Sequence, residues 1–252
     1  MLRQMGGIDI LNSVTSTHID NFAPMEHVLD NPVWNALMSG NKQLDRGNDQ
    51  VKYFDTEVSP FVGLKENSAD NFRLLYDLVP DKRFCLFVAP VQVEIPAYWK
   101  VLVSIPGLQM VHDKNSPLDE VGEKLVLLTD EHIPQMLALT KLTDPGPFAE
   151  RTIEFGHYMG VFDGDKLVAM AGQRMHAFNY AEISAVCTHP DHTGKGYARQ
   201  LLLHHIHRIK AASNMPYLHV RHDNERAIKV YERLGFSTRT EVYFYALMKN
   251  DI

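Results

Sequence analysis

The chain has few cysteines and no long apolar run. Its two cysteines, Cys85 and Cys187, lie far apart and show no C-x-x-C or metal-ligand spacing. We expect both thiols to be small buried side chains, which fits a reducing cytoplasm. No window of about 18 apolar residues occurs, and residues 1–20 have no apolar core of a secretion signal. The sequence therefore predicts a cytoplasmic protein that does not span a membrane.

An excess of basic residues is also absent. The chain has 25 Lys and Arg residues against 31 Asp and Glu residues, which gives a formal net charge of −6. Nucleic acid is not an expected partner, because binding to its phosphates needs clustered basic side chains. With 45% hydrophobic and 22% charged residues, the composition is that of a globular protein with one large domain or two small ones.

Strand-like and helical segments alternate along the chain, which predicts an α/β or α+β sheet with helices packed on it. Expected helices start at Pro32 and cover 68–79, 132–142, 197–213 and 225–234, and more helical residues follow a break at 144–147. Expected strands lie at 51–64, 83–89, 124–128, 158–162, 167–175, 181–188, 217–220 and 241–248, with further strand-like residues at 91–111 that Pro96 and Pro106 should interrupt.

A turn-rich linker at 113–119 predicts two domains, residues 1–118 and residues 119–252. The two halves share a short match, because Glu57-Val58-Ser59 resembles the segment 182–184 and each is followed by an arginine with leucines. We hypothesise an internal duplication, although a match this short also arises by chance. The N-terminal half would then help to shape a binding site or form an interface.

The most informative segment is 186–202. An apolar strand ends in His189-Pro190, a polar loop carries Gly194 and Gly196, and an amphipathic helix follows. A helix N-terminus offers unpaired N–H groups, and glycines let a phosphate approach the main chain. The glycines that a P-loop or a dinucleotide fingerprint needs are missing from their required positions. The segment is therefore either another kind of diphosphate cradle or a plain tight turn.

Two motifs resemble those of the GNAT superfamily of N-acetyltransferases. Residues 193–198 are similar to its acetyl-CoA motif [QR]-x-x-G-x-[GA], although Thr193 replaces the usual Gln or Arg, a loss that Lys195 can offset. Residues 224–236 are similar to its N-x-x-A-x-x-x-Y-x-x-x-G-F motif. The resemblance covers about 122–248 and implies a mixed, mostly antiparallel sheet flanked by helices. Two tandem related halves are expected, of which the first is a degenerate GNAT-like domain.

The resemblance implies acetyl-CoA as the cosubstrate, with its pantetheine inserted between splayed strands 181–188 and 217–220. Backbone groups of Val186 and Thr188 would pair with it, and the glycine loop would hold the diphosphate. Asn224 would contact the cofactor, or serve only as a helix N-cap. The expected cofactor-binding residues are Val186, Cys187, Thr188, Thr193, Gly194, Lys195, Gly196, Tyr197, Ala198, Asn224, Ala227 and Tyr231.

Two residues are candidates for catalysis. Tyr231 shares a helix face with Ala227 and can be a core residue, but in the family this position donates a proton to the departing CoA thiolate. The acceptor amine must lose a proton, and Glu182, on the strand that leads to the acyl site, is the leading base. A solvated strand carboxylate is the alternative, and Glu154 and His176 are weaker candidates. We expect direct transfer in a ternary complex, because no G-x-S-x-G for an acyl-serine occurs.

The chain has 13 histidines, three of them in the segment 204–207, but none in a metal-ligand spacing. We expect that segment to be a polar outer helix face and the protein to use no metal. The sequence thus predicts an acyltransferase that moves an acetyl group to the primary amine of a small molecule or peptide. The acceptor pocket is expected from the loop 144–155 and the N-terminal half. The alternative is an acyl-CoA-binding sensor or interaction module, and both a monomer and a homodimer stay open.

Overall fold

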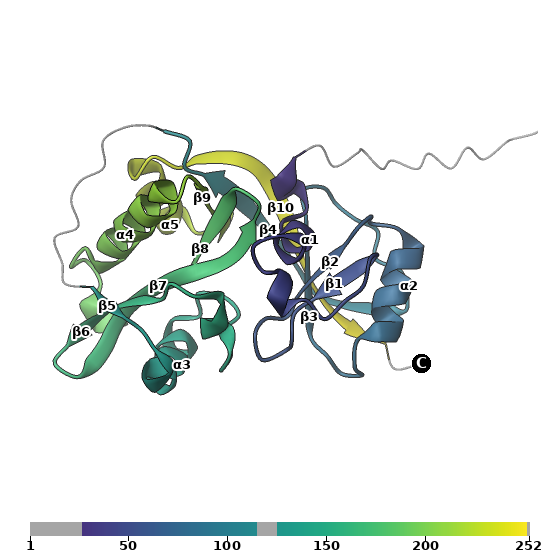
Figure 1. Cartoon of the computed structure of the whole chain (residues 1–252), viewed down its shortest axis with the longest axis horizontal. Coiled ribbons are helices and arrows are strands. Elements are labelled where there is room, and N and C mark those ends of the chain that lie inside the picture. The colour runs from purple at the N-terminus through teal and green to yellow at the C-terminus, as the bar shows by residue number, and fades with distance from the viewer. Residues whose placement is uncertain (1–26, 115–124, 251–252) are drawn as a thin grey trace, which may run out of the picture.

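The structure, a computed structural model, describes residues 27–114 and 125–250, which form a ten-stranded sheet in the order β1-β2-β3-β10-β4-β9-β8-β7-β6-β5 (Figure 1). The strands are β1 Val51–Tyr53, β2 Phe61–Leu64, β3 Cys85–Ala89, β4 Trp99–Val111, β5 Val126–Leu127, β6 Met159–Asp163, β7 Lys166–Ala177, β8 Tyr180–Thr188, β9 Met215–Arg221 and β10 Ser237–Lys249. The helices are α1 Pro32–Met38, α2 Ala69–Leu78, α3 Ile133–Thr143, α4 Tyr197–Ala211 and α5 Glu225–Arg233. The mixed, mostly antiparallel sheet with flanking helices confirms the predicted fold class.

The centre of the sheet joins the two predicted halves. β10, from the C-terminal half, lies between β3 and β4, and β4 in turn pairs with β9. The parallel pairs are β2 with β3 and β8 with β9, and a helix connects the strands of each pair. Such a repeat is what a duplication would leave, but the duplication and the division at residue 118 stay predictions. The segment 115–124 lies outside the described residues.

Most predicted elements are present, with three differences. The strand expected at 51–64 is two strands, β1 and β2, which pair antiparallel. β4 runs without a break through Pro106, whose carbonyl oxygen accepts a hydrogen bond from the His222 N–H on the β9 side. Pro106 lacks an N–H, and the missing group would face that same side. Because β4 pairs with β9 only from Gly107 onward, no hydrogen bond between the strands is lost at the proline. The helical stretch expected after 144–147 is only a short 3-10 helix, Thr152–Phe155.

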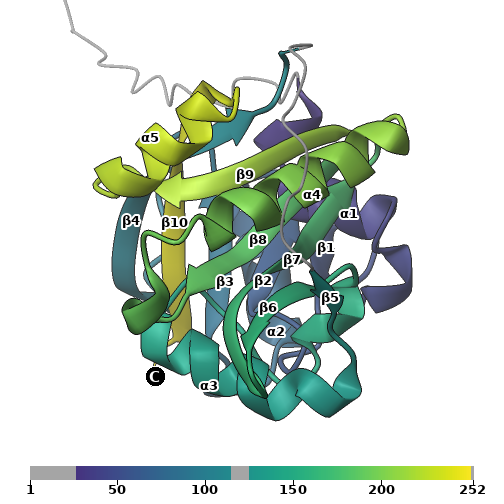
Figure 2. The same cartoon turned by 90° about the vertical axis from the view of Figure 1, so that its left-hand side faces the viewer.

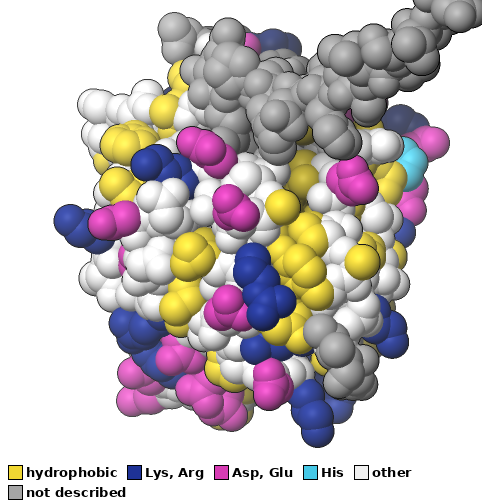
Figure 3. All heavy atoms as spheres, turned by 90° about the vertical axis from the view of Figure 1, so that its right-hand side faces the viewer, with side chains coloured by type: hydrophobic (Ala, Val, Ile, Leu, Met, Phe, Trp, Pro, Cys, Tyr) yellow, Lys and Arg dark blue, Asp and Glu magenta, His cyan; other side chains and the backbone are white. Residues whose placement is uncertain are grey.

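Helices cover both faces of the sheet (Figure 2). On one face, Leu202 and Ile206 of α4 pack against Ile183 of β8 and Leu218 of β9. On the other face, α1 packs against β1, β2 and β7 and so contacts both halves. Because side chains alternate along a strand, Glu182 of β8 points away from α4. At the α2 end of the molecule, basic and acidic side chains are interspersed around a band of hydrophobic ones (Figure 3).

The buried side chains confirm one prediction and correct another. Cys85 and Cys187 are free and buried, and burial raises the pKa of each thiol to about 11. The predicted polar outer face at 204–207 is wrong for His205, which is 0% exposed because its position on α4 faces β7. None of the helices in 27–114 and 125–250 has the length and hydrophobicity of a membrane span.

Candidate active site

The strands β8 and β9 part before they end. Their parallel pairing runs from Tyr180 opposite Met215 to Glu182 opposite Tyr217, yet β8 continues to Thr188. A register shift between β7 and β8 falls in the same segment, where Ala185 adopts a left-handed φ of 53°. Past Glu182, the edge of β8 that faces β9 therefore has no strand pairing, which is the splay that the resemblance implied.

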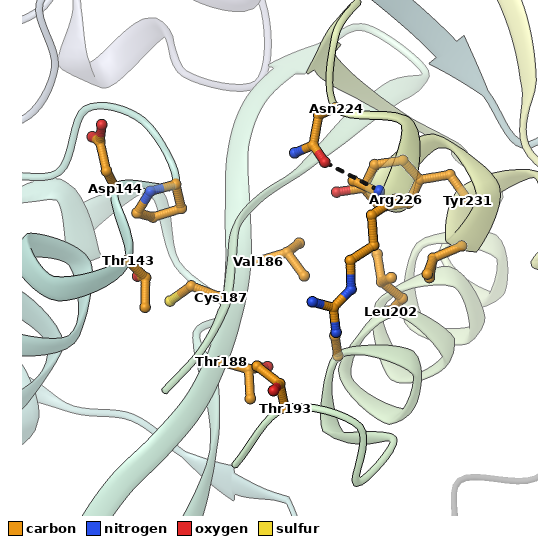
Figure 4. Close-up of a pocket in the computed structure, with 14 residues that line it drawn as sticks. Thr143, Asp144, Val186, Cys187, Thr188, Thr193, Leu202, Asn224, Arg226 and Tyr231 are labelled. Atoms are coloured by element: carbon orange, nitrogen blue, oxygen red, sulfur yellow. Dashed lines mark hydrogen bonds between the residues drawn. The ribbon is translucent and has the colours of Figure 1, made fainter. Parts of the chain in front are cut away.

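A cavity of about 390 Å³ lies at this gap (Figure 4). It is lined from β8 in the middle, from α4 and α5 on one side, and from the end of α3 on the other. The lining residues are Thr143, Asp144, Pro145, Val186, Cys187, Thr188, Thr193, Ala198, Leu202, Asn224, Arg226, Ala227, Val230 and Tyr231. The cavity thus brings together residues of both motifs, eight of the twelve predicted cofactor-binding positions. Gly194, Lys195, Gly196 and Tyr197 connect two lining residues, Thr193 and Ala198, without lining the cavity themselves.

The glycine loop leaves the start of α4 open. Gly194 and Gly196 have φ values of 82° and 85°, the left-handed region that other residues enter only with strain. A Cβ atom at either position would meet nothing within 4 Å, so conformation and not space requires the glycines. Gly196 is the N-cap of α4 and no side chain caps this helix. Its first N–H groups are therefore available to an anion.

The start of α5 contributes a polar and a basic group. The Asn224 side-chain oxygen accepts a hydrogen bond from the Ala227 N–H at 3.2 Å, so Asn224 is an N-cap and also lines the cavity. Arg226 runs from α5 toward Thr193, and the described residues give its guanidinium no ion pair (Figure 4). Sequence reasoning missed Arg226, although it lies inside the second motif, in the first turn of a helix that faces the glycine loop.

Tyr231 reaches from α5 into the cavity (Figure 4). Burial raises the pKa of Tyr231 to about 12, so its hydroxyl stays protonated at neutral pH. Nearby, the Thr188 hydroxyl oxygen is buried and has no hydrogen-bond partner among the described residues. The cavity therefore holds a neutral phenol and an unsatisfied polar atom beside the unpaired edge of β8.

Glu182 is not solvated, because its side chain is 0% exposed. Both its oxygens accept hydrogen bonds from Arg174, at 2.8 and 2.6 Å, and His219 Nδ1 lies 2.7 Å from Oε1. Burial by itself would raise the pKa of Glu182, but the Arg174 guanidinium and the His219 contact hold it at about 2. A carboxylate with this pKa accepts protons poorly, and Glu182 does not line the cavity. Its role as the base stays a prediction.

His219 is fixed by a chain of hydrogen bonds. Arg239 Nε donates to Gln109 Oε1, which leaves the Gln109 amide nitrogen to donate to the Leu29 carbonyl and to His219 Nε2. With Nε2 accepting, Nδ1 carries the proton that is donated to Glu182. Both nitrogens of His219 are thus engaged. The weaker candidates Glu154 and His176 do not line the cavity either, and Glu154 pairs with Arg151 at 2.6 Å.

The end of α3 forms the remaining wall. Thr143, Asp144 and Pro145 line the cavity on the side of β8 that faces away from α4. The sequence identified this region only as a break and an acceptor loop, because nothing in the local pattern shows which strand a loop will reach. Among the described residues, no group of three or more His, Cys, Asp or Glu residues could hold a metal ion.

Comparison with known proteins assigns this arrangement to a class, the acetyltransferases. A family model described as FR47-like protein matches residues 158–245. A crystal structure described as an acetyltransferase of the GNAT family from Novosphingobium aromaticivorans is 35% identical, with a TM-score of 0.82, and the match covers 89% of this chain and 100% of that one. The chain therefore belongs to the GNAT family.

Two other relatives are more distant. N-alpha-acetyltransferase RimI of Mycobacterium tuberculosis is 34% identical over 101 residues, which cover 37% of this chain and 62% of that protein, so the chain spans less than two thirds of this curated relative. A GCN5-related N-acetyltransferase from Kribbella flavida shares the fold, with a TM-score of 0.55, 14% identity, and coverage of 84% of this chain and 92% of that one.

Proposed function

We propose that the chain is an acetyl-CoA-dependent N-acetyltransferase that transfers an acetyl group directly to a primary amine. The observation that carries this proposal is the cavity at the gap between β8 and β9. Residues of the glycine-loop motif, Thr193 and Ala198, line it together with Asn224 and Tyr231 of the second motif. The relatives are named acetyltransferases, which favours an enzyme over a sensor that binds acyl-CoA without turnover.

The residues present fit acetyl-CoA. The uncapped start of α4, with the N–H groups of residues 194–198, suits the diphosphate, and Arg226 adds a cation that the described residues leave unpaired. The unpaired edge of β8 at Val186 and Thr188 suits the pantetheine amides, and the orphaned Thr188 hydroxyl offers one more polar contact. When bound, acetyl-CoA supplies the thioester that the amine attacks.

Tyr231 would act on the leaving sulfur. A phenol with a pKa of about 12 does not readily transfer its proton to a thiolate, because the ordinary pKa of a thiol is about 8.5. The hydroxyl therefore contributes mainly by donating a hydrogen bond that strengthens as negative charge develops on sulfur. A hydrogen bond to a charged group contributes about 1.5 to 3 kcal/mol, which corresponds to about 10-fold to 150-fold in rate.

Glu182 would act as a positioning residue. Its bonds to Arg174 of β7 and His219 of β9 tie three strands together at the last paired position before β8 and β9 part. This keeps the gap at a fixed place in the sheet. The amine's proton would then pass to water, since a carboxylate with a pKa of about 2 is a weak base and the oxygens of Glu182 already accept hydrogen bonds from its neighbours.

The N-terminal half would hold no cofactor. Its parallel pair, β2 and β3, is buried along both strands, and a Cβ on Gly63 of β2 would lie 2.6 Å from the Trp34 nitrogen of α1. The Ser68 hydroxyl accepts a hydrogen bond from the Asn71 N–H and so caps α2 itself. Titration calorimetry should therefore find one acetyl-CoA per chain.

The proposal is tested by release of the CoA thiol from acetyl-CoA across a panel of amino acids, polyamines, aminoglycosides, arylamines and short peptides. Turnover that depends on one class of amine supports it. Tight binding of acetyl-CoA without turnover of any acceptor in the panel would favour the sensor instead.

A further inference from the structure

Asp144 ends α3 in a left-handed conformation. Its φ of 46° and ψ of 57° are left-handed, and its N–H donates to the Thr140 carbonyl at 2.8 Å. Glycine usually occupies this place at the end of a helix, and asparagine and aspartate also enter it, because their short polar side chains can hydrogen-bond locally. The backbone turn ends the helix at the cavity wall, where Asp144 is one of the lining residues.

The Asp144 carboxylate carries an unneutralised charge. The side chain is exposed, and no hydrogen bond or ion pair to its carboxylate is found within 27–114 and 125–250. Arg221 is close enough for Asp144 to help raise the pKa of that arginine. However, the Arg221 guanidinium is already held by both oxygens of Asp223, at 3.0 and 2.7 Å.

The cavity therefore has opposite charges at its two ends. Arg226 and the open start of α4 make one end positive, whereas Asp144 makes the α3 end negative, on the opposite side of β8 (Figure 4). Phosphates suit the first end. The second end suits a cation, and Tyr231 of α5 lies across the cavity from Asp144.

We propose that Asp144 binds a second ammonium group of a doubly cationic acceptor, so that the preferred substrates are diamines. This inference rests on the proposed function. The amine that attacks must be neutral, and a carboxylate beside it would favour its charged form. Asp144 lies across the cavity from Tyr231, and therefore suits the acceptor's other amine and leaves the reacting amine free to lose its proton.

The test compares 1,4-diaminobutane with n-butylamine, which has the same carbon chain and one amine. For the wild type, we expect kcat/KM to be about 10-fold to 100-fold higher for the diamine. Asp144→Asn keeps the shape and tolerates the left-handed backbone, and it should lower kcat/KM for the diamine to about the value for n-butylamine. Asp165→Asn, in the exposed turn between β6 and β7, is the matched control and should change neither.

A binding measurement supports the kinetics. N,N,N′,N′-tetramethyl-1,4-diaminobutane has no N–H to acylate, and its Kd for the wild type by calorimetry should rise about tenfold in Asp144→Asn. Equal kcat/KM for the two amines in the wild type, or equal effects of the two variants, would overturn the role of Asp144 while turnover itself still upholds the proposed function. No turnover with these amines or with the wider panel would overturn both.

Discussion

Replacing Glu182 with glutamine should destabilise the protein by about 3 kcal/mol at pH 7. The lowered pKa of Glu182, from 4.5 to about 2, corresponds to about 3 kcal/mol of preference for the ionised form in the folded state. Removing one partner of a buried ion pair typically costs about 3 to 5 kcal/mol, because the Arg174 guanidinium would stay buried without its carboxylate. The two magnitudes agree.

The lowered pKa of Glu182 also predicts how the stability difference between wild type and variant changes with pH. Because the folded pKa lies below the unfolded one, the stabilisation is fully present above about pH 4.5 and is lost as the pH falls toward 2. Urea unfolding followed by tryptophan fluorescence should show the gap between wild type and Glu182→Gln narrowing to about 1 to 2 kcal/mol at pH 3. Glu150→Gln, an exposed carboxylate, is the control and should show no gap.

The same variant separates positioning from proton transfer. A group with a pKa of about 2 does not titrate in the range where the enzyme is assayed, so the pH profile of kcat should keep its shape in Glu182→Gln. An unchanged stability at pH 7, or an acidic limb of the wild-type profile that disappears in the variant, would refute this reasoning and support Glu182 as the base.

Two further changes have expected outcomes. Burial, together with Arg208, lowers the pKa of His205 to about 3, so wild-type stability should fall by about 2 kcal/mol between pH 7 and pH 5 as the unfolded state takes up a proton. In His205→Leu this loss of stability between pH 7 and pH 5 should be absent. An unchanged loss, measured by urea unfolding at the two pH values, would contradict the prediction. Arg226→Gln should raise the KM for acetyl-CoA about tenfold with kcat unchanged, and the KM of the wild type should rise more steeply with salt. A KM that does not move would show that Arg226 contacts no phosphate.

The local pattern predicted much of the fold. The alternation of apolar and polar residues located nearly every strand and helix, since this signal acts over a few residues. The position of β10 between β3 and β4 was not predictable, because strand order depends on contacts between distant segments. The break expected at Pro106 was wrong for the same reason. Whether a proline interrupts a strand depends on whether its edge of that strand is paired, which the local sequence does not show.

The candidate site was predicted only where a motif marks it. The glycine loop, Asn224 and Tyr231 could be identified because they stand at the spacings of two motifs that resemble those of the GNAT superfamily. The burial of His205 and the ion pair between Glu182 and Arg174 could not, because a polar residue in sequence carries no sign of the neighbours that will pair with it. Asp144 and Arg226 enter the cavity through tertiary folding alone.

The most direct test of the central claim is thiol release by wild type and Tyr231→Phe, alongside calorimetry of acetyl-CoA binding. The variant removes one oxygen and keeps the ring that packs beside Phe236. We expect kcat to fall about 10-fold to 150-fold while the Kd for acetyl-CoA changes by less than about twofold. If the wild type turns over acetyl-CoA and Tyr231→Phe has the same kcat, the role of Tyr231 at the leaving sulfur is contradicted.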